Sequence, residues 1–136
     1  MKTGALGKIY QAGEVIVRQG DQGDCMYVIQ EGQVEILKEI DGRKVQLALR
    51  GEGEFFGEMA LFEGGTRTAT VRAMGTARVL TIDKKNFLRR IHEDPSLAYH
   101  LVKSMSARIR QLSEDVARLE NLLDRDSSSA IAGSNR

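Results

Sequence analysis

The segment that decides the fold is GEFFGEMALFEGGTRTATV, residues Gly53–Val71. Gly57 and the residues after it predict a tight turn that opens one helical turn, and unpaired backbone amides at a helix start form an anion site. Glu58 lies beside those amides, where its carboxylate can accept hydrogen bonds from sugar hydroxyls. Arg67 follows a Gly-Gly loop at the head of an apolar strand, and a guanidinium holds two phosphate oxygens at once. Together these residues predict a site for a phosphorylated sugar.

The rest of residues 9–83 is a series of short alternating runs separated by turns. The expected strands are Glu14–Arg18, Cys25–Gln30, Gln33–Lys38, Lys44–Leu49, Arg67–Arg72 and Arg78–Ile82. Asp41-Gly42, between two of these runs, is a strong signal for a hairpin. Turn signals that recur this often predict an antiparallel sandwich or roll.

Two helices are expected after Asp83, which can cap the first of them, Lys84–Ile91. Asp94-Pro95 predicts the start of the second helix, because it supplies an N-cap followed by a first-turn proline. No Gly or Pro interrupts the chain from there to about Asp124, so this helix has about 30 residues and a length of roughly 45 Å. The small and polar segment 126–136 is expected to be a disordered tail.

The long helix carries apolar residues in steps of four and three, which is the pattern of a coiled-coil seam. β-Branched residues recur at one core position of each heptad, and this choice favours a parallel two-stranded coil. The predicted dimer seam comprises Val102, Met105, Ile109, Leu112, Val116, Leu119 and Leu123. The alternative is that the stripe packs on the chain's own strands, as its first two turns are expected to do because Leu97 and Leu101 widen the apolar face there.

Length, charge and cysteine content exclude several classes of protein. The 136 residues suit one domain, and the net charge of +1 argues against a broad nucleic-acid footprint. A single cysteine, Cys25, excludes internal disulfides. No apolar run reaches the roughly 20 residues of a membrane span, and the N-terminus lacks the apolar core of a signal peptide. We therefore expect a soluble, cytoplasmic protein.

No pattern for metal binding or nucleophilic catalysis is visible in the sequence. His92 and His100 have no Cys or carboxylate at metal-ligand spacing, which also argues against a cupin-type metalloenzyme. The serines of the long helix have no base partner. Cys25 starts an apolar strand and is interpreted as a buried small hydrophobe, with a reactive thiol as the alternative. The sequence therefore predicts a binding module without catalytic residues, metal or cofactor.

The combination of motifs resembles the cyclic nucleotide-binding domain. This module occurs in bacterial catabolite activators, cyclic-nucleotide-dependent kinases and cyclic-nucleotide-gated channels. Gly57–Phe62 through Arg67–Ala69 matches the phosphate-binding cassette of that family. Gly20-Asp21 through Tyr27–Ile29, with Gly32–Val34, matches its turn-strand-turn signature. The similarity covers about residues 9–125.

The resemblance implies a fold and a set of contacts. The fold would be mainly β, an eight-stranded antiparallel β-roll of the jelly-roll type, followed by a short helix and a long C-terminal helix. Glu58 would bind the ribose 2′-hydroxyl and Arg67 the exocyclic phosphate oxygens. The amides of Gly57, Met59, Ala60 and Thr68 would line the phosphate, and Ala69 is the next residue of the cassette. Val34 and Leu47 would form an apolar wall along the nucleotide. The family binds the nucleotide and does not cleave it.

Two departures from the catabolite activator affect the expected partners. The helix-turn-helix is absent, so no DNA reading of that kind is expected. A threonine-serine pair reads the adenine there, and Leu112-Ser113 takes its place here. Thr68 follows Arg67, and in cGMP-dependent relatives a threonine at this position bonds the guanine. On family prevalence the predicted ligand is cAMP; the alternatives are a cGMP sensor, or a structural dimerisation module with a degenerate pocket.

The expected organisation is an N-terminal extension over residues 1–8, a cyclic nucleotide-binding domain over 9–125 and a tail over 126–136. Within the domain, the roll would take residues 9–83 and the helices 84–125. The expected partners are a cyclic nucleotide, a second copy of the chain and an effector protein that the sequence does not identify. Neither DNA nor a membrane is expected as a partner.

Overall fold

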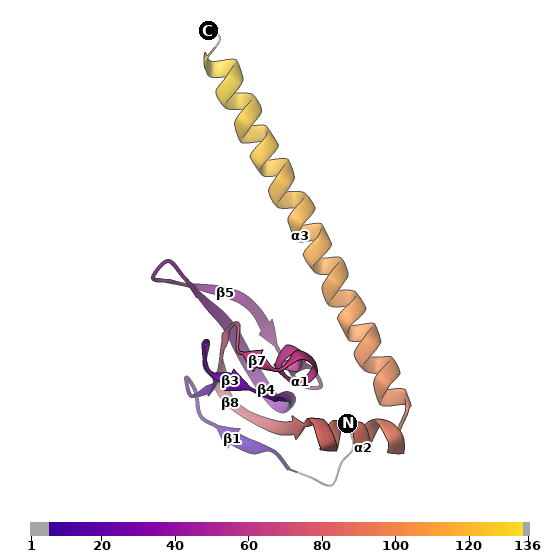
Figure 1. The fold of residues 1–136 in the computed structure, drawn as a ribbon. Helices are drawn as coiled ribbons and strands as arrows, with labels where there is room; N and C mark the ends of the chain where they lie inside the picture. Colours follow the sequence, from indigo (N-terminus) through magenta and orange to yellow (C-terminus); the bar gives the residue numbers. More distant parts are fainter. Residues whose placement is uncertain (1–5, 135–136) are drawn as a thin grey trace. The chain divides into compact units, whose positions relative to one another are not determined.

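The computed structural model describes the backbone of residues 6–134 and the side chains of residues 6–126. The chain divides into two compact units, one that ends at Arg89 and one that starts at Arg90, and each is described by itself (Figure 1). The strands are β1 (Lys8–Tyr10), β2 (Val15–Val17), β3 (Gln22–Gly23), β4 (Cys25–Ile40), β5 (Arg43–Arg50), β6 (Phe55–Phe56), β7 (Gly65–Thr66) and β8 (Thr70–Asp83). The helices are α1 (Glu58–Glu63), α2 (Lys84–Glu93) and α3 (Ser96–Ser134).

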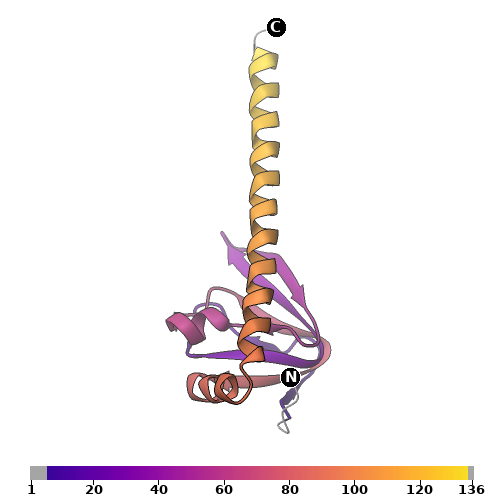
Figure 2. The same cartoon turned by 90° about the vertical axis from the view of Figure 1, so that its right-hand side faces the viewer.

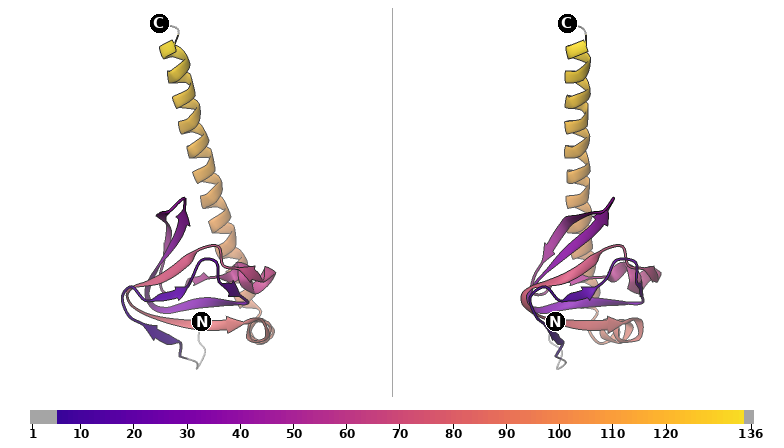
Figure 3. Two further views of the ribbon diagram at one scale, coloured as in Figure 1. Left: turned by 60° about the vertical axis from the view of Figure 1, so that its left-hand side comes forward. Right: turned by 90° about the vertical axis from the view of Figure 1, so that its left-hand side faces the viewer.

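The first unit is built on antiparallel strand pairs. Six strands form one sheet in the order β1-β8-β4-β5, with β2 paired to β8 and β6 paired to β4, while β3 and β7 form a separate two-stranded sheet. Figure 3 shows β4 and β5 projecting together as a long hairpin. Over residues 6–134 the strands do not close into a barrel. The predicted fold class, mainly antiparallel β with C-terminal helices, is confirmed.

The two central strands are longer than the sequence predicted, because each joins two predicted strands into one. The runs on either side of Gly32 are continuous in β4, and those on either side of Gly75 belong to β8. Both glycines have positive φ values, 82° and 68°, a conformation that other residues rarely adopt. The predicted turns are therefore bends within strands, and the β4–β8 register shifts between Ile29 and Gln33.

The hairpin between β4 and β5 turns at the predicted pair. Asp41 and Gly42 have φ values of 52° and 77°, as a two-residue turn of the primed type requires. The register closes on Ile40 and Arg43 at the end of the ladder. The Asp-Gly hairpin prediction is therefore confirmed.

The core of the first unit is formed by strands in which apolar and polar residues alternate. Its buried residues are Val17, Ile29, Val34, Phe56, Val71, Ala73, Ala77 and Val79. The Tyr27 ring stacks on Phe56 with the centroids 5.0 Å apart. Six of these eight residues belong to β4 and β8, so these two paired strands supply most of the core.

Both predicted helix caps are present. The Asp83 carboxylate accepts a hydrogen bond of 2.8 Å from the Asn86 amide, and α2 then runs to Glu93, two residues beyond the predicted end. The Asp94 carboxylate accepts a hydrogen bond of 3.2 Å from the Ser96 amide. Helix α3 starts at Ser96, so Pro95 precedes its first residue.

Helix α3 is longer than the sequence predicted. It continues without interruption to Ser134 (Figure 2), although its predicted end was near Asp124 and the segment 126–136 was predicted to be disordered. Between Ser96 and Ala132 the sequence has no Gly or Pro to stop it, and small polar residues alone do not end a helix. The predicted boundary at 125 is therefore not where the helix ends. No helix among the described residues is long and apolar enough to cross a membrane.

The bend at Gly32 predicts a large loss of stability when a side chain is added there. A Cβ at Gly32 would collide with the Thr76 carbonyl oxygen, while one at Gly13 would meet nothing within 4 Å, and both residues have φ near 80°. We expect Gly13→Ala to cost about 1–2 kcal/mol for the left-handed conformation alone. We expect Gly32→Ala to cost at least about 3 kcal/mol, since the β4–β8 contact must also move. Urea unfolding of both variants measures this difference, and equal losses would contradict it.

Candidate functional site

The candidate site is centred on Arg67, which lies in the loop between β7 and β8. The sequence predicted this arginine at the head of a strand, but β8 starts at Thr70. Its backbone is tied to the turn before β3, because the Arg67 amide donates to the Asp21 carbonyl oxygen at 2.7 Å and the Gly20 amide donates to the Arg67 carbonyl oxygen at 2.9 Å. The adjacent β3–β7 pair extends this connection, with Gln22 opposite Thr66 and Gly23 opposite Gly65. The loop that carries Arg67 is therefore part of a paired structure.

The Arg67 side chain is buried, with 7% of its surface exposed. Its Nη1 donates to the Gly57 carbonyl oxygen at 3.1 Å, and its Nη2 donates to the Cys25 Sγ at 3.4 Å. The guanidinium carbon lies 5.5 Å from the centroid of the Tyr27 ring. Among the residues with described side chains, no carboxylate forms an ion pair with Arg67. A buried cation is costly unless an anion compensates it, so this arrangement suits an anionic ligand.

Two glycines leave room for the guanidinium. A Cβ at Gly23 would collide with Nε of Arg67. A Cβ at Gly57 would lie 2.8 Å from Nη1, and Gly57 also has a φ of 76°. The absence of side chains at these positions therefore leaves the space that the guanidinium occupies.

Tyr27 provides a polar neighbour that stays uncharged. Burial raises the pKa of Tyr27 to about 12, with a hydrogen bond to Cys25 as a further cause, while Arg67 acts in the opposite direction. A phenol with this pKa is protonated at neutral pH. Tyr27 therefore offers its ring face to the guanidinium without neutralising it.

The predicted helical turn next to Arg67 is present as α1. Gly57 is its N-cap residue, with the left-handed backbone that lets the chain turn sharply from β6 into the helix. Ala60 and Leu61 are buried and anchor the helix, and the Gly64 amide donates to the Ala60 carbonyl oxygen at 2.9 Å to end it. Glu58 is the first residue of α1, where a carboxylate is favoured by the helix dipole.

The predicted residues of the segment 57–69 differ in contact and in exposure. Gly57 and Arg67 are in direct contact, and Glu58 follows Gly57. The other cassette residues differ in exposure: Met59 and Thr68 are exposed, Ala60 is buried and Ala69 is half-buried.

The predicted apolar wall is only partly open to a ligand. Val34 is fully buried in the core, so it has no surface for a ligand, whereas Leu47 is 53% exposed on β5. Half-buried Ile36 lies on the same strand as Val34 and pairs with Ala48. Ile36 therefore has more surface available than the residue that the sequence indicated.

Three contributors to the site were not assigned to it from the sequence. Gly23, Cys25 and Tyr27 surround the Arg67 guanidinium. They lie in and beside the Gly-Asp turn that the sequence did single out, but Cys25 was interpreted as a buried hydrophobe. It is half-buried, and its sulfur accepts a hydrogen bond from the arginine. The Gly-Asp turn closely precedes β4 in the sequence, but nothing in this local pattern indicated contact with Arg67.

Leu112 and Ser113 lie on α3, in the second unit. Both are exposed in the single chain. Their predicted contact with a nucleotide base stays a prediction.

Comparison with known proteins gives a consistent set of relatives. The chain is 32% identical over 105 residues to a protein described as the cyclic AMP receptor protein of Thermus thermophilus, covering 76% of this chain and 49% of that protein. It is 40% identical over 85 residues to a cGMP-dependent protein kinase of Caenorhabditis briggsae, covering 60% of this chain and 11% of the kinase. The crystal structure of the Thermus thermophilus catabolite activator protein matches with a TM-score of 0.74 and 31% identity, covering 83% of this chain and 54% of that one.

The chain therefore spans about half, or less, of the length of these relatives. Residues 8–94 match the family model described as the cyclic nucleotide-binding domain. This match includes Arg67, the two glycines beside its guanidinium and the whole of α1. The chain belongs to the cyclic nucleotide-binding domain family.

Proposed function

We propose that the chain is a sensor that binds cyclic AMP through the segment 57–69. The observation that carries this proposal is the buried Arg67 guanidinium, which has hydrogen bonds to Gly57 and Cys25 but no carboxylate partner among the described side chains. A cyclic phosphate supplies the missing negative charge. Bidentate bonds between a guanidinium and phosphate oxygens are among the stronger hydrogen bonds in proteins.

The other residues of the segment have complementary proposed roles. Glu58 binds the ribose 2′-hydroxyl, and the amides of Gly57, Met59, Ala60 and Thr68 line the phosphate. Leu47, exposed on β5, forms the apolar wall of the nucleotide. The proposed binding domain covers residues 9–125, and its proposed role is to bind the nucleotide without cleaving it.

Relatives of this chain are named for both cyclic nucleotides, so the choice of cAMP is the finer part of the proposal. The relative named for cyclic AMP covers 76% of this chain, and the kinase named for cGMP covers 60%. The alternative, a cGMP sensor, is supported by Thr68, whose exposed hydroxyl follows Arg67 directly.

We further propose that the chain forms a parallel homodimer through α3. Six apolar residues at heptad spacing are 55–66% exposed in the single chain: Val102, Ile109, Leu112, Val116, Leu119 and Leu123. Burying such a stripe against a second copy removes apolar surface from water, which is the main driving force for coiled-coil association. In this proposal the dimer is a cytoplasmic regulator that signals to an effector protein. A dimerisation module with a degenerate pocket is the alternative, and the titration below separates the two.

Removal of the arginine side chain tests the phosphate contact. We expect Arg67→Ala to weaken binding of cAMP by about 1.5 to 3.5 decades, since loss of one partner of a buried charge pair costs roughly 2–5 kcal/mol. Calorimetric titration of the wild type and the variant measures this change. Arg43→Ala, at the exposed hairpin turn, is the matched control and should bind as the wild type does. If the affinity of Arg67→Ala for cAMP is within threefold of the wild-type affinity, the proposed contact between Arg67 and the phosphate is wrong.

The hydroxyl at Thr68 tests the choice of base. If it bonds the guanine amino group, Thr68→Ala should lower the affinity for cGMP by up to about tenfold and leave the affinity for cAMP nearly unchanged. Side-by-side titrations with the two nucleotides check this, with Thr81→Ala, exposed on β8, as the control. Equal losses for both nucleotides would instead assign Thr68 to the phosphate that they share.

A charge in the seam tests the dimer. Ile109→Asp would place two carboxylates against each other in the proposed interface without compensation for their desolvation. We expect this variant to be largely monomeric at micromolar concentration, as measured by sedimentation velocity. Ser104→Asp adds the same charge to the same helix outside the seam and should remain dimeric. An Ile109→Asp chain that stays dimeric refutes the seam.

A further inference from the structure

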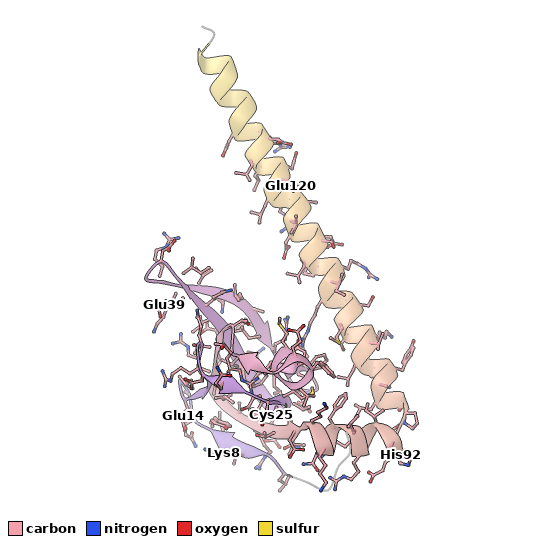
Figure 4. All side chains as sticks on the ribbon, in the orientation of Figure 1. Lys8, Glu14, Cys25, Glu39, His92 and Glu120 are labelled. Carbon is pink, nitrogen blue, oxygen red and sulfur yellow. The ribbon has the colours of Figure 1, made fainter. Side chains whose placement is uncertain are left out.

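The thiol of Cys25 is one of the two groups that hold the Arg67 guanidinium. Cys25 is the first residue of β4 and is labelled in Figure 4, where it lies at the end of the strand. Its half-buried sulfur accepts a hydrogen bond from Nη2 at 3.4 Å, while Nη1 donates to the Gly57 carbonyl oxygen at 3.1 Å. One acceptor on each terminal nitrogen fixes the plane of the guanidinium.

Neither acceptor is a carboxylate. A carbonyl oxygen carries no formal charge, and a cysteine sulfur is a weak acceptor. The nearby Tyr27 is protonated at neutral pH, because burial raises its pKa to about 12. A carboxylate in the place of the thiol would form a charge-assisted bond about twice as strong as a neutral one, and would offset the charge of the arginine. Arg67 is therefore oriented by its neighbours while it keeps its positive charge.

We infer that Cys25 is a positioning residue that sets the anion affinity of the site through Arg67. Its thiol orients Nη2 and leaves the charge of the guanidinium available to a bound phosphate. Any negative charge fixed at position 25 then competes with the phosphate, whereas a neutral group of the same shape does not. The inference rests on the proposed function and names the residue that adjusts the affinity of that site.

Two substitutions of the same shape separate charge from packing. Asp and Asn differ by one charge and hardly in volume, so Cys25→Asp and Cys25→Asn strain the half-buried position about equally. We expect Cys25→Asp to bind cAMP and cGMP at least about tenfold more weakly than Cys25→Asn, since two opposite charges at this distance attract strongly in a partly buried site. Calorimetric titration of the full chain, after circular dichroism has shown that both variants are folded, measures the ratio. Equal affinities of the two variants would overturn the inference.

The contact itself is tested without a nucleotide and on the wild-type thiol. Two methanethiosulfonate reagents, one with an anionic sulfonatoethyl group and one with a cationic trimethylammonioethyl group, convert the thiol to a disulfide. The Cys25 sulfur bonds to the reagent's sulfur, the bond from that sulfur to the sulfonyl group breaks, methanesulfinate leaves and the thiol proton passes to solvent. The measured quantity is the ratio of the anionic to the cationic rate.

We expect this ratio to be at least about threefold higher in the wild type than in Arg67→Gln, because the guanidinium attracts the anionic reagent. A ratio that Arg67→Gln leaves unchanged would overturn the inference, whether or not the Asp and Asn variants fold. If the wild type binds neither nucleotide, the proposed function fails while the rate ratio still decides the contact. If the wild type binds and the Asp and Asn variants bind equally, the function stands and the inference fails.

Discussion

The rest of the site depends on one buried guanidinium that forms no ion pair with a carboxylate among the described side chains. Arg67 is 7% exposed, and burial of a lone cation is unfavourable unless its hydrogen bonds are satisfied and its charge meets an anion. The protein supplies two hydrogen-bond acceptors, a carbonyl oxygen and a cysteine sulfur, and neither is a carboxylate. Positions 23 and 57 are glycines, and a Cβ at either position would collide with the guanidinium.

The same constraint explains why the site is assembled from distant parts of the sequence. Cys25 is 42 residues from Arg67, and it reaches the guanidinium from the start of a strand that pairs with β8 over most of its length. The β4–β8 ladder therefore positions the acceptor, and the β3–β7 pair positions the loop that carries the donor. The strand pairing of the first unit therefore also determines the geometry of the site.

The elements governed by local rules could be predicted from the sequence. The recurrent turn signals predicted the antiparallel class, and the Asp41-Gly42 pair located the hairpin because its turn requires positive φ values. The bend at Gly32 was interpreted as a turn, since a glycine in a strand and a glycine between strands look alike without the partner strand. The end of α3 was missed because small polar residues are tolerated in a helix as well as in a coil.

The local structure around the candidate site was predicted where its residues are adjacent in the sequence, whereas contacts across strands were not. The turn from Gly57 into α1 was identified from five consecutive residues. Val34 was assigned to a ligand wall because the family resemblance implies it, but a resemblance in sequence does not tell a buried position from an open one on the same strand face. The link from Cys25 to Arg67 had no local signal at all, because it depends on tertiary pairing.

The small β3–β7 sheet has a consequence for motion. It consists of two residue pairs, Gln22 with Thr66 and Gly23 with Gly65, and two more backbone bonds tie Arg67 to the preceding turn. Because this ribbon is so short, its strands can separate at a fraction of the free energy needed to unfold the six-stranded sheet. Its amide hydrogens are therefore expected to exchange with solvent through local opening. We expect the hydrogen bonds of Arg67 to Gly57 and Cys25 to break when the ribbon opens. An anion bound across this junction would hold the ribbon closed, so occupancy of the site and the opening rate of the ribbon are linked thermodynamically.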